Sequence, residues 1–202
     1  NRYLAFLSCP GSGTPLKSIE KLLPGEAIVI KDGSIVDRWF WYKLPIFNNP
    51  KKNINEEKAI SGIARYLRRA VHRQMVSDVP LGAFLSGGLD SSAIVAFAKE
   101  KNPNIRCFTI NTIGGQDKGI VDDLPYAKRA SEYLNVSLDV VTIDSHRMAS
   151  DLESMVIQLD EPLADPAALN VLYISKLARE QGIKVLLSGA GGDDLFTGYR
   201  RH

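Results

Sequence analysis

Apolar and polar positions alternate in blocks from residue 79 onward. Short apolar, strand-like runs occupy residues 83–85, 105–110, 136–143 and 183–187. Stretches with helical spacing occupy residues 92–101, 124–134, 148–159 and 165–181. Short apolar strands separated by helices of about ten residues or more predict a parallel, doubly wound α/β sheet. Ligands of such sheets bind outside the carboxyl ends of the strands, so the loops there are the first candidates for chemistry.

The N-terminal part of the chain follows a different pattern. β-branched and aromatic runs at 27–30 and 35–42 flank Lys31-Asp32-Gly33-Ser34, which predicts a β-hairpin with a tight turn. Residues 46–55 are polar and rich in turn formers, as is typical of a linker. We therefore expect a separate N-terminal element in residues 1–45 and a larger domain that begins at residue 56.

A helix is predicted at the start of the larger domain. Asn55 precedes Glu56 and Glu57, and this order suits an N-cap followed by an acidic first turn. Apolar residues then recur at helical spacing between Ile60 and Val71. The arginines that fill the remaining positions are interpreted as a solvated basic face.

Composition sets limits on function. Hydrophobic residues make up 45% of the chain and charged residues 24%, which are ordinary values for a globular protein. The net charge of +2 gives no reason to expect a nucleic-acid or membrane surface. Cys9 and Cys107 are too few for a disulfide framework and lack the spacing of metal ligands. No apolar run reaches membrane length and no signal peptide is visible, so a cytoplasmic protein is expected.

The strongest chemical signal is Ser86-Gly87-Gly88-Leu89-Asp90-Ser91-Ser92, which lies between a predicted strand and a predicted helix. Glycines allow close backbone approach, and backbone N–H groups, hydroxyls and the helix dipole together favour an anion. Asp90 would repel that anion unless a cation lies between them, which predicts a Mg²⁺ ligand. The loop lacks the Gly-Lys-Ser/Thr ending of a Walker P-loop. An ordinary βα turn is the alternative interpretation.

The same loop resembles the pyrophosphate-binding loop of the ATP-pyrophosphatase (N-type, PP-loop) superfamily. A second segment, Ser188-Gly189-Ala190-Gly191-Gly192-Asp193-Asp194-Leu195-Phe196-Thr197-Gly198-Tyr199, resembles a signature of glutamine-hydrolysing asparagine synthetases. Between them, in that family's order, stand Phe108-Thr109-Ile110, Asp160-Glu161-Pro162 and Asp165-Pro166. The resemblance implies that residues 56–202 are the N-terminal part of a synthetase domain with an adenine-nucleotide α-hydrolase-like fold. It also implies that residues 1–45 are the end of an Ntn-type glutaminase domain and that 46–55 link the two.

The resemblance implies how ATP would bind. Its pyrophosphate would lie over residues 86–92, where backbone N–H groups and hydroxyls meet the phosphates. Leu85 and Ile110 would border the adenosine, with core packing as the competing role for both side chains. Ser188 and Gly189 would contact the nucleotide through their backbone.

The implied reaction is ATP-dependent amidation of a carboxylate by a carbon–nitrogen ligase of asparagine biosynthesis. Asp90 and Asp193 would hold Mg²⁺. The substrate, aspartate or a similar carboxylate, would attack the α-phosphorus to give an acyl-adenylate and pyrophosphate. Ammonia from glutamine would then displace AMP. Asp160, Glu161 and Asp165 would hold the substrate's ammonium group or the ammonia, and of these Asp165 could instead cap a helix.

Three positions depart from the family pattern. Ala190 stands where the family carries a Glu that assists adenylate formation or deprotonates the amine, and alanine cannot accept a proton. Asp194 replaces another Glu, and Cys9 does not match the glutaminase nucleophile. The lysine that the family uses to stabilise the transition state would lie beyond His202. We therefore expect a piece of a longer protein, with ATP binding but little synthetase activity of its own.

Three functions remain open at this point. One is asparagine synthesis, the second is amidation of another carboxylate, and the third is a catalytically degenerate nucleotide-binding module. In each case the expected ligands are ATP and Mg²⁺, joined in the first two by a small carboxylate and ammonia from glutamine. No nucleic acid or membrane partner is expected, and a homodimer is compatible with the sequence.

Overall fold

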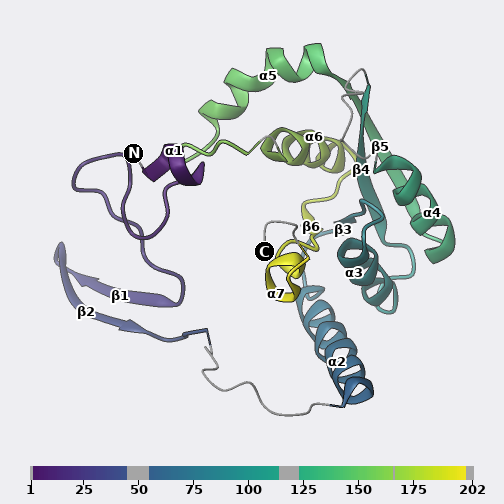
Figure 1. Ribbon diagram of the computed structural model, residues 1–202, viewed down its shortest axis with the longest axis horizontal. Helices are drawn as coiled ribbons and strands as arrows, with labels where there is room; N and C mark the ends of the chain where they lie inside the picture. The colour runs from purple at the N-terminus through teal and green to yellow at the C-terminus, as the bar shows by residue number, and fades with distance from the viewer. Residues whose placement is uncertain (1, 45–54, 114–122, 166, 199–202) are drawn as a thin grey trace. The chain divides into compact units, whose positions relative to one another are not determined.

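The computed structural model describes residues 2–44, 55–113, 123–165 and 167–198 (Figure 1). The chain forms two compact units. The N-terminal unit comprises Asn1–Ile54 together with Val156–Pro166, and the sheet unit comprises Asn55–Met155 and Ala167–His202. A segment late in the sequence thus belongs to the N-terminal unit, although the chain on either side of it belongs to the sheet unit.

The N-terminal unit contains a short helix and the predicted β-hairpin. These elements are α1 (Arg2–Phe6), β1 (Glu26–Lys31) and β2 (Ser34–Phe40). The two strands pair antiparallel. Asp32 and Gly33 both have positive φ, at 51° and 76°, which is the backbone of a two-residue type I′ turn. The hairpin that the sequence predicts is therefore confirmed, because Asp-Gly is a pair that accepts this conformation.

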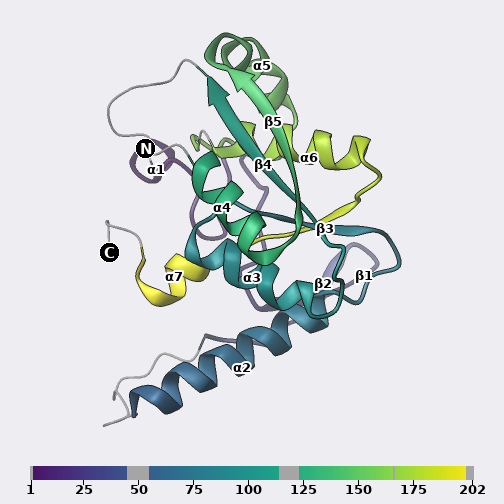
Figure 2. The same ribbon diagram turned by 90° about the vertical axis from the view of Figure 1, so that its right-hand side faces the viewer.

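The sheet unit is built on four parallel strands in the order β5-β4-β3-β6. The strands are β3 (Leu81–Phe84), β4 (Arg106–Ile113), β5 (Ser137–Asp144) and β6 (Val185–Leu187). Its helices are α2 (Glu56–Gln74), α3 (Leu89–Lys99), α4 (Leu124–Leu134), α5 (Ser145–Ile157), α6 (Ala167–Glu180) and α7 (Gly192–Phe196). Figure 2 shows α3 and α4 in front of the sheet and α6 behind it. The predicted α/β class with a doubly covered parallel sheet is confirmed.

The strand order reverses next to β3. The chain runs from β3 through α3 to β4 and through α4 to β5, and then returns to pair β6 with the other edge of β3. In parallel α/β sheets, a reversal of this kind opens a crevice outside the carboxyl ends of the strands, where ligands bind. The loops that follow β3 and β6 both leave the sheet at this place.

The core packs against both faces of the sheet. One cluster includes Val71 of α2, Val95 of α3, and Ala83 and Cys107 of the strands, and the last three are 0% exposed. A second cluster is centred on Phe108 and joins α6 to β4. The strand residues before the first loop are therefore held from both sides, which gives that loop a rigid base.

One helix begins earlier than predicted because a side chain caps it. The predicted helix at 148–159 begins earlier, at Ser145, since Asp144 Oδ1 accepts a hydrogen bond from Arg147 N–H at 2.7 Å. The N-cap predicted at Asn55 is confirmed, with Oδ1 2.8 Å from Glu57 N. The linker at 46–55 lies almost wholly outside the described residues, as do Pro166 and Tyr199 of the quoted motifs. Of the helices described, none has both the length and the apolar character needed to cross a membrane.

Candidate functional site: two loops at the carboxyl edge of the sheet

The first loop, residues 86–92, is closed by its own serines. Ser91 is 8% exposed, and its Oγ lies 3.3 Å from Ser86 N and 3.0 Å from Ser86 Oγ. The Ser91 hydroxyl donates to Gly88 O at 3.2 Å, so the Ser86 hydroxyl is the donor between the two side chains. Three contacts on one buried hydroxyl hold the loop in a single shape. Of the predicted hydroxyl donors, Ser91 is thus committed to the loop itself.

Gly87 is needed at its position for two separate reasons. Its φ is +81°, a backbone conformation that side chains rarely adopt. A Cβ there would also overlap the backbone of Tyr126 and Ala127 in the first turns of α4. Gly88, by contrast, has φ −69°, and a Cβ would lie 3.5 Å from the nearest atom, Ser86 Oγ. The first loop is therefore pressed against α4 at Gly87 and is open at Gly88.

The start of α3 suits an anion. Gly88 is its N-cap residue, and no side chain caps the helix there. An uncapped helix start presents backbone N–H groups and the positive end of the helix dipole. Gly88 is exposed, and Leu89 is 85% exposed, so this surface is reachable from solvent. Asp90 lies in the first turn of the helix and is half-buried.

The second loop, residues 188–193, lies directly on the first. A Cβ at Gly189 would be 2.9 Å from Ser91 N and 3.0 Å from Asp90 Cβ. A Cβ at Gly192 would overlap the carboxylate of Asp90. These two glycines allow the second loop to approach α3 closely, and the sequence pattern alone did not assign that role to either.

Asp90 and Asp193 are brought to neighbouring places by this contact. The Asp90 carboxylate lies against Gly192, the residue before Asp193, and Asp193 is half-buried in the first turn of α7. The Asp193 carboxylate in turn lies against Gly198. Among the described residues, no group of three or more His, Cys, Asp or Glu side chains could hold a metal ion. Carboxylate oxygens are ligands that the hard Mg²⁺ ion prefers, and a Mg²⁺ site at Asp90 and Asp193 stays a prediction.

The remaining predicted contacts differ in how accessible they are. Leu85 is 1% exposed and belongs to the core, whereas Ile110 is half-buried at the margin of the second core cluster. Ser188 is exposed, and its Oγ accepts a hydrogen bond from Ala190 N at 3.1 Å. Ala190 is itself exposed, so its methyl group fills no core position.

Glu161 belongs to the N-terminal unit, whereas both loops belong to the sheet unit. Its carboxylate forms an ion pair with Lys21, with Oε2 and Oε1 at 2.8 and 3.0 Å from Lys21 Nζ. The structure describes no arrangement of Glu161 relative to the loops. A role for Glu161 or Asp160 at the substrate stays a prediction.

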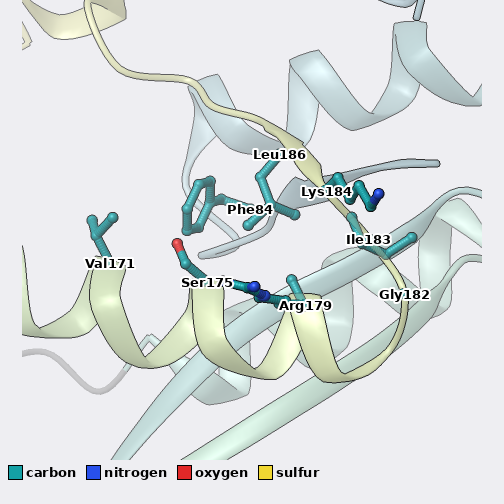
Figure 3. Close-up of a pocket in the computed structure, with 9 residues that line it drawn as sticks. Phe84, Val171, Ser175, Arg179, Gly182, Ile183, Lys184 and Leu186 are labelled. Atoms are coloured by element: carbon teal, nitrogen blue, oxygen red, sulfur yellow. The ribbon is translucent and has the colours of Figure 1, made fainter. Parts of the chain in front are cut away.

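A cavity that the sequence analysis did not predict lies between α6 and the strands β3 and β6. Its volume is about 710 Å³. Figure 3 shows Phe84 and Leu186 on the strand side, with Ser175 and Arg179 of α6 on the other side. None of the predicted site residues lines it. The only sequence signal for it is the juxtaposition of the basic residues Arg179 and Lys184 with apolar strand residues.

Comparison with known proteins gives one family and several relatives. The family model described as asparagine synthase matches residues 62–202. The chain is 32% identical, over 98% of its length, to 30% of "asparagine synthetase [glutamine-hydrolyzing] 1" of Bacillus subtilis. It is 34% identical, over 82% of its length, to 24% of a putative asparagine synthetase of Mycobacterium tuberculosis. It is 28% identical, over 93% of its length, to 30% of an amidase, chyE, of Penicillium rubens. The chain thus spans about a third or less of the length of these relatives.

Proposed function

Because the chain belongs to the asparagine synthase family, we propose that it forms the ATP-binding part of a ligase that amidates a carboxylate. One observation carries the proposal. The second loop packs on the first through Gly189 and Gly192, and the Asp90 carboxylate, in the first turn of α3, lies against Gly192, the residue before Asp193. This contact supports a site in which the start of α3 binds the phosphates of a nucleotide and the two aspartates bind its divalent cation.

In this proposal the first loop binds the phosphates of ATP. The backbone N–H groups at the start of α3 donate to phosphate oxygens, and the exposed position of Gly88 leaves room for them. Ser92 supplies the hydroxyl that can turn toward the ligand, since the Ser86 and Ser91 hydroxyls bond to each other and close the loop. Ile110, at the neighbouring strand, borders the adenosine. These donors are fixed before the reaction, so they stabilise developing charge without rearranging.

Asp90 and Asp193 are the residues that would hold Mg²⁺. The cradle formed at Gly189 and Gly192 supports this assignment, because it places the Asp90 carboxylate against the backbone that carries Asp193. Bound Mg²⁺ would neutralise negative charge on the departing pyrophosphate. The two aspartates would thereby orient the phosphate chain.

The proposed reaction has two steps. A carboxylate oxygen of the substrate bonds to the α-phosphorus and the bond to pyrophosphate breaks, giving an acyl-adenylate. Ammonia then bonds to the acyl carbon, AMP leaves, and a proton is lost from nitrogen as the amide forms. The names of the relatives suggest glutamine as the source of the ammonia. These relatives are about three times as long as this chain. The whole protein would carry both glutamine hydrolysis and ATP-dependent amidation.

Aspartate is the first candidate substrate, and Ala190 favours a second. The exposed methyl group of Ala190 cannot accept a proton from an incoming amine, so the site differs from the family pattern where substrate chemistry is controlled. The similarity to an amidase supports a different carboxylate as the alternative substrate. A degenerate module that binds nucleotide without turnover is the third candidate.

Pyrophosphate release by the full-length protein separates these candidates. ATP, Mg²⁺ and ammonia are supplied with aspartate, with other small carboxylic acids, or with no acid. Release that depends on aspartate supports asparagine synthesis, and release only with another acid supports the amidase-like alternative. Absence of release with every acid, together with measurable ATP binding, supports the degenerate module. Absence of ATP binding contradicts the proposal as a whole.

A further inference from the structure

Lys21 forms an ion pair within the N-terminal unit. Its Nζ lies 2.8 and 3.0 Å from the two carboxylate oxygens of Glu161 and 2.5 Å from Cys9 O. The ammonium group thus has three oxygen acceptors. The side chains of Lys21 and Glu161 are 33% and 38% exposed, so solvent screens the pair only in part. The partners are 140 residues apart in sequence.

A second contact joins the same parts of the chain. Ala164 N–H donates a hydrogen bond to Leu7 O at 2.9 Å. The segment Val156–Pro166 is therefore held to the first 54 residues at two points, through Glu161 and through Ala164. An ion pair with three acceptors and a separate backbone hydrogen bond restrict both the position and the direction of this segment.

The chain order gives this anchor its importance. The segment ends where α6 begins, and α6 packs its Leu169 and Tyr173, 5% and 2% exposed, in the sheet unit. A segment of the N-terminal unit therefore continues directly into a core helix of the sheet unit.

We propose that Lys21 is a positioning residue that locks Glu161, and with it the segment Val156–Pro166, to the N-terminal unit. Along the chain, the locked segment is followed by α6 of the sheet unit. The anchoring rests on the contacts described above. Its consequence for catalysis, that the lock keeps glutamine hydrolysis in step with ATP use, rests on the proposed function.

Amide hydrogen exchange tests the anchor directly on this chain. Lys21→Met removes the ammonium group and keeps an unbranched apolar stem, and Lys17→Met is the matched control at an exposed lysine four positions earlier. We expect exchange at Ala164 N–H to accelerate about tenfold or more in Lys21→Met, because loss of a charged hydrogen-bonded partner shifts local opening by that amount. Lys17→Met should stay within about twofold of the parent chain. Equal exchange in both variants overturns the proposal.

Swapping the charges of residues 21 and 161 distinguishes a specific ion pair from general destabilisation. The double variant Lys21→Glu with Glu161→Lys should recover at least half of the protection that either single variant loses, and Lys21→Arg should keep most of it. If the double variant loses as much amide protection as the two single variants lose together, the ion-pair lock is overturned. Neither measurement involves ATP, so they stand even if the proposed function is wrong.

Coupling in the full-length protein is the second readout. We expect Lys21→Met to raise the ratio of glutamine hydrolysed to pyrophosphate released, while glutamine hydrolysis alone stays near the parent rate. Lys21→Arg should restore the ratio. A ratio that is unchanged in Lys21→Met, in a protein that does release pyrophosphate, overturns the coupling role. A protein that releases no pyrophosphate with any acid instead contradicts the proposed function and leaves the exchange result as the test of the anchor.

Discussion

The two loops of the candidate site are held in place in different ways. The first, residues 86–92, is supported by the sheet beneath it, by α4 against Gly87 and by its own Ser86–Ser91 hydrogen bonds. The second, residues 188–193, has one local side-chain bond, from Ala190 N to Ser188 Oγ, and its glycine contacts point to the first loop. The first loop is thus held by the sheet and by α4, whereas the second loop is positioned by its contacts with the first.

This difference has a consequence for substitution. Substitutions in the first loop should lower the stability of the whole sheet unit, since that loop contacts β3 and α4. Damage in the second loop should mainly disturb the place where Asp90 meets Gly192, and so ligand binding more than folding. Substitutions in both loops, measured for stability and for ligand affinity, test this distinction.

The largest effect is expected from Gly87→Ala. Alanine at φ +81° is strained, and its Cβ would overlap the backbone at the start of α4, so stability should fall by about 3 kcal/mol. Denaturant unfolding of the parent and variant chains measures this. Gly88→Ala is the matched control, because Gly88 has negative φ and open space, and it should change stability by less than about 1 kcal/mol. Equal losses at Gly87 and Gly88 would contradict the described loop.

Gly192→Ala should separate binding from folding. The new Cβ would displace the Asp90 carboxylate, which is the end of a side chain rather than backbone, so the fold can adjust. We expect Mg²⁺–ATP affinity to fall about thirtyfold, which corresponds to about 2 kcal/mol, with a smaller change in unfolding free energy. Calorimetric titration and denaturant unfolding of the same variant give the two numbers. A variant that loses stability but keeps its affinity would reverse the comparison between the loops.

Ser91→Ala should loosen the first loop from within. The buried hydroxyl accepts from Ser86 and donates to Gly88 O, and its removal leaves Ser86 N–H without this acceptor. The expected cost is about 1–2 kcal/mol of stability. Thermal unfolding measures it, with Ser61→Ala in the exposed face of α2 as the control. A loss at Ser91 no larger than that at Ser61 would show that the hydroxyl does not close the loop.

The smallest effect concerns the sheet below the first loop. Burial, and then the charge of Asp139, raise the pKa of the Cys107 thiol from 9.0 to about 12. As pH rises, the Cys107 thiol ionises in the unfolded chain before it ionises in the folded chain, and this favours unfolding. The contribution of the thiol to the free energy of unfolding is therefore complete below pH 9 and is lost as pH rises toward 12. At pH 9.5 the loss is about 0.8 kcal/mol. Between pH 8 and pH 9.5 the unfolding free energy should therefore fall by about 0.8 kcal/mol less in Cys107→Ala than in the parent chain. An identical fall in both proteins would contradict the burial of the Cys107 thiol away from water.

Much of the fold follows from local sequence. Short apolar strands between helices place the loops after β3 and β6 at one edge, and Asp32-Gly33 specifies a turn that needs two positive φ angles. The chemistry of the first loop is also local, since glycine, hydroxyl and carboxylate groups stand within seven residues there. These features depend on periodicity and residue type, which a single sequence displays.

Other features depend on residues far apart in the chain. The contact between Gly192 and Asp90 joins positions about a hundred residues apart, and no local pattern shows that a Cβ at residue 192 would meet a carboxylate. The pair of Lys21 and Glu161 is similarly distant. A solvated side chain and a paired one look the same in the sequence. The sequence therefore indicated which residues could act, and the structure shows which of them are brought together.

ATP titration into this chain measures whether Asp90 and Asp193 act together on a magnesium-bound triphosphate. Asp90→Asn and Asp193→Asn keep the side-chain shape and remove the charge, and Asp194→Asn is the control at the exposed neighbour. We predict Mg²⁺-dependent binding that falls about tenfold or more in the first two variants and less than about twofold in the third. Equal affinity in all three variants, or binding that does not change when Mg²⁺ is chelated, would contradict the account.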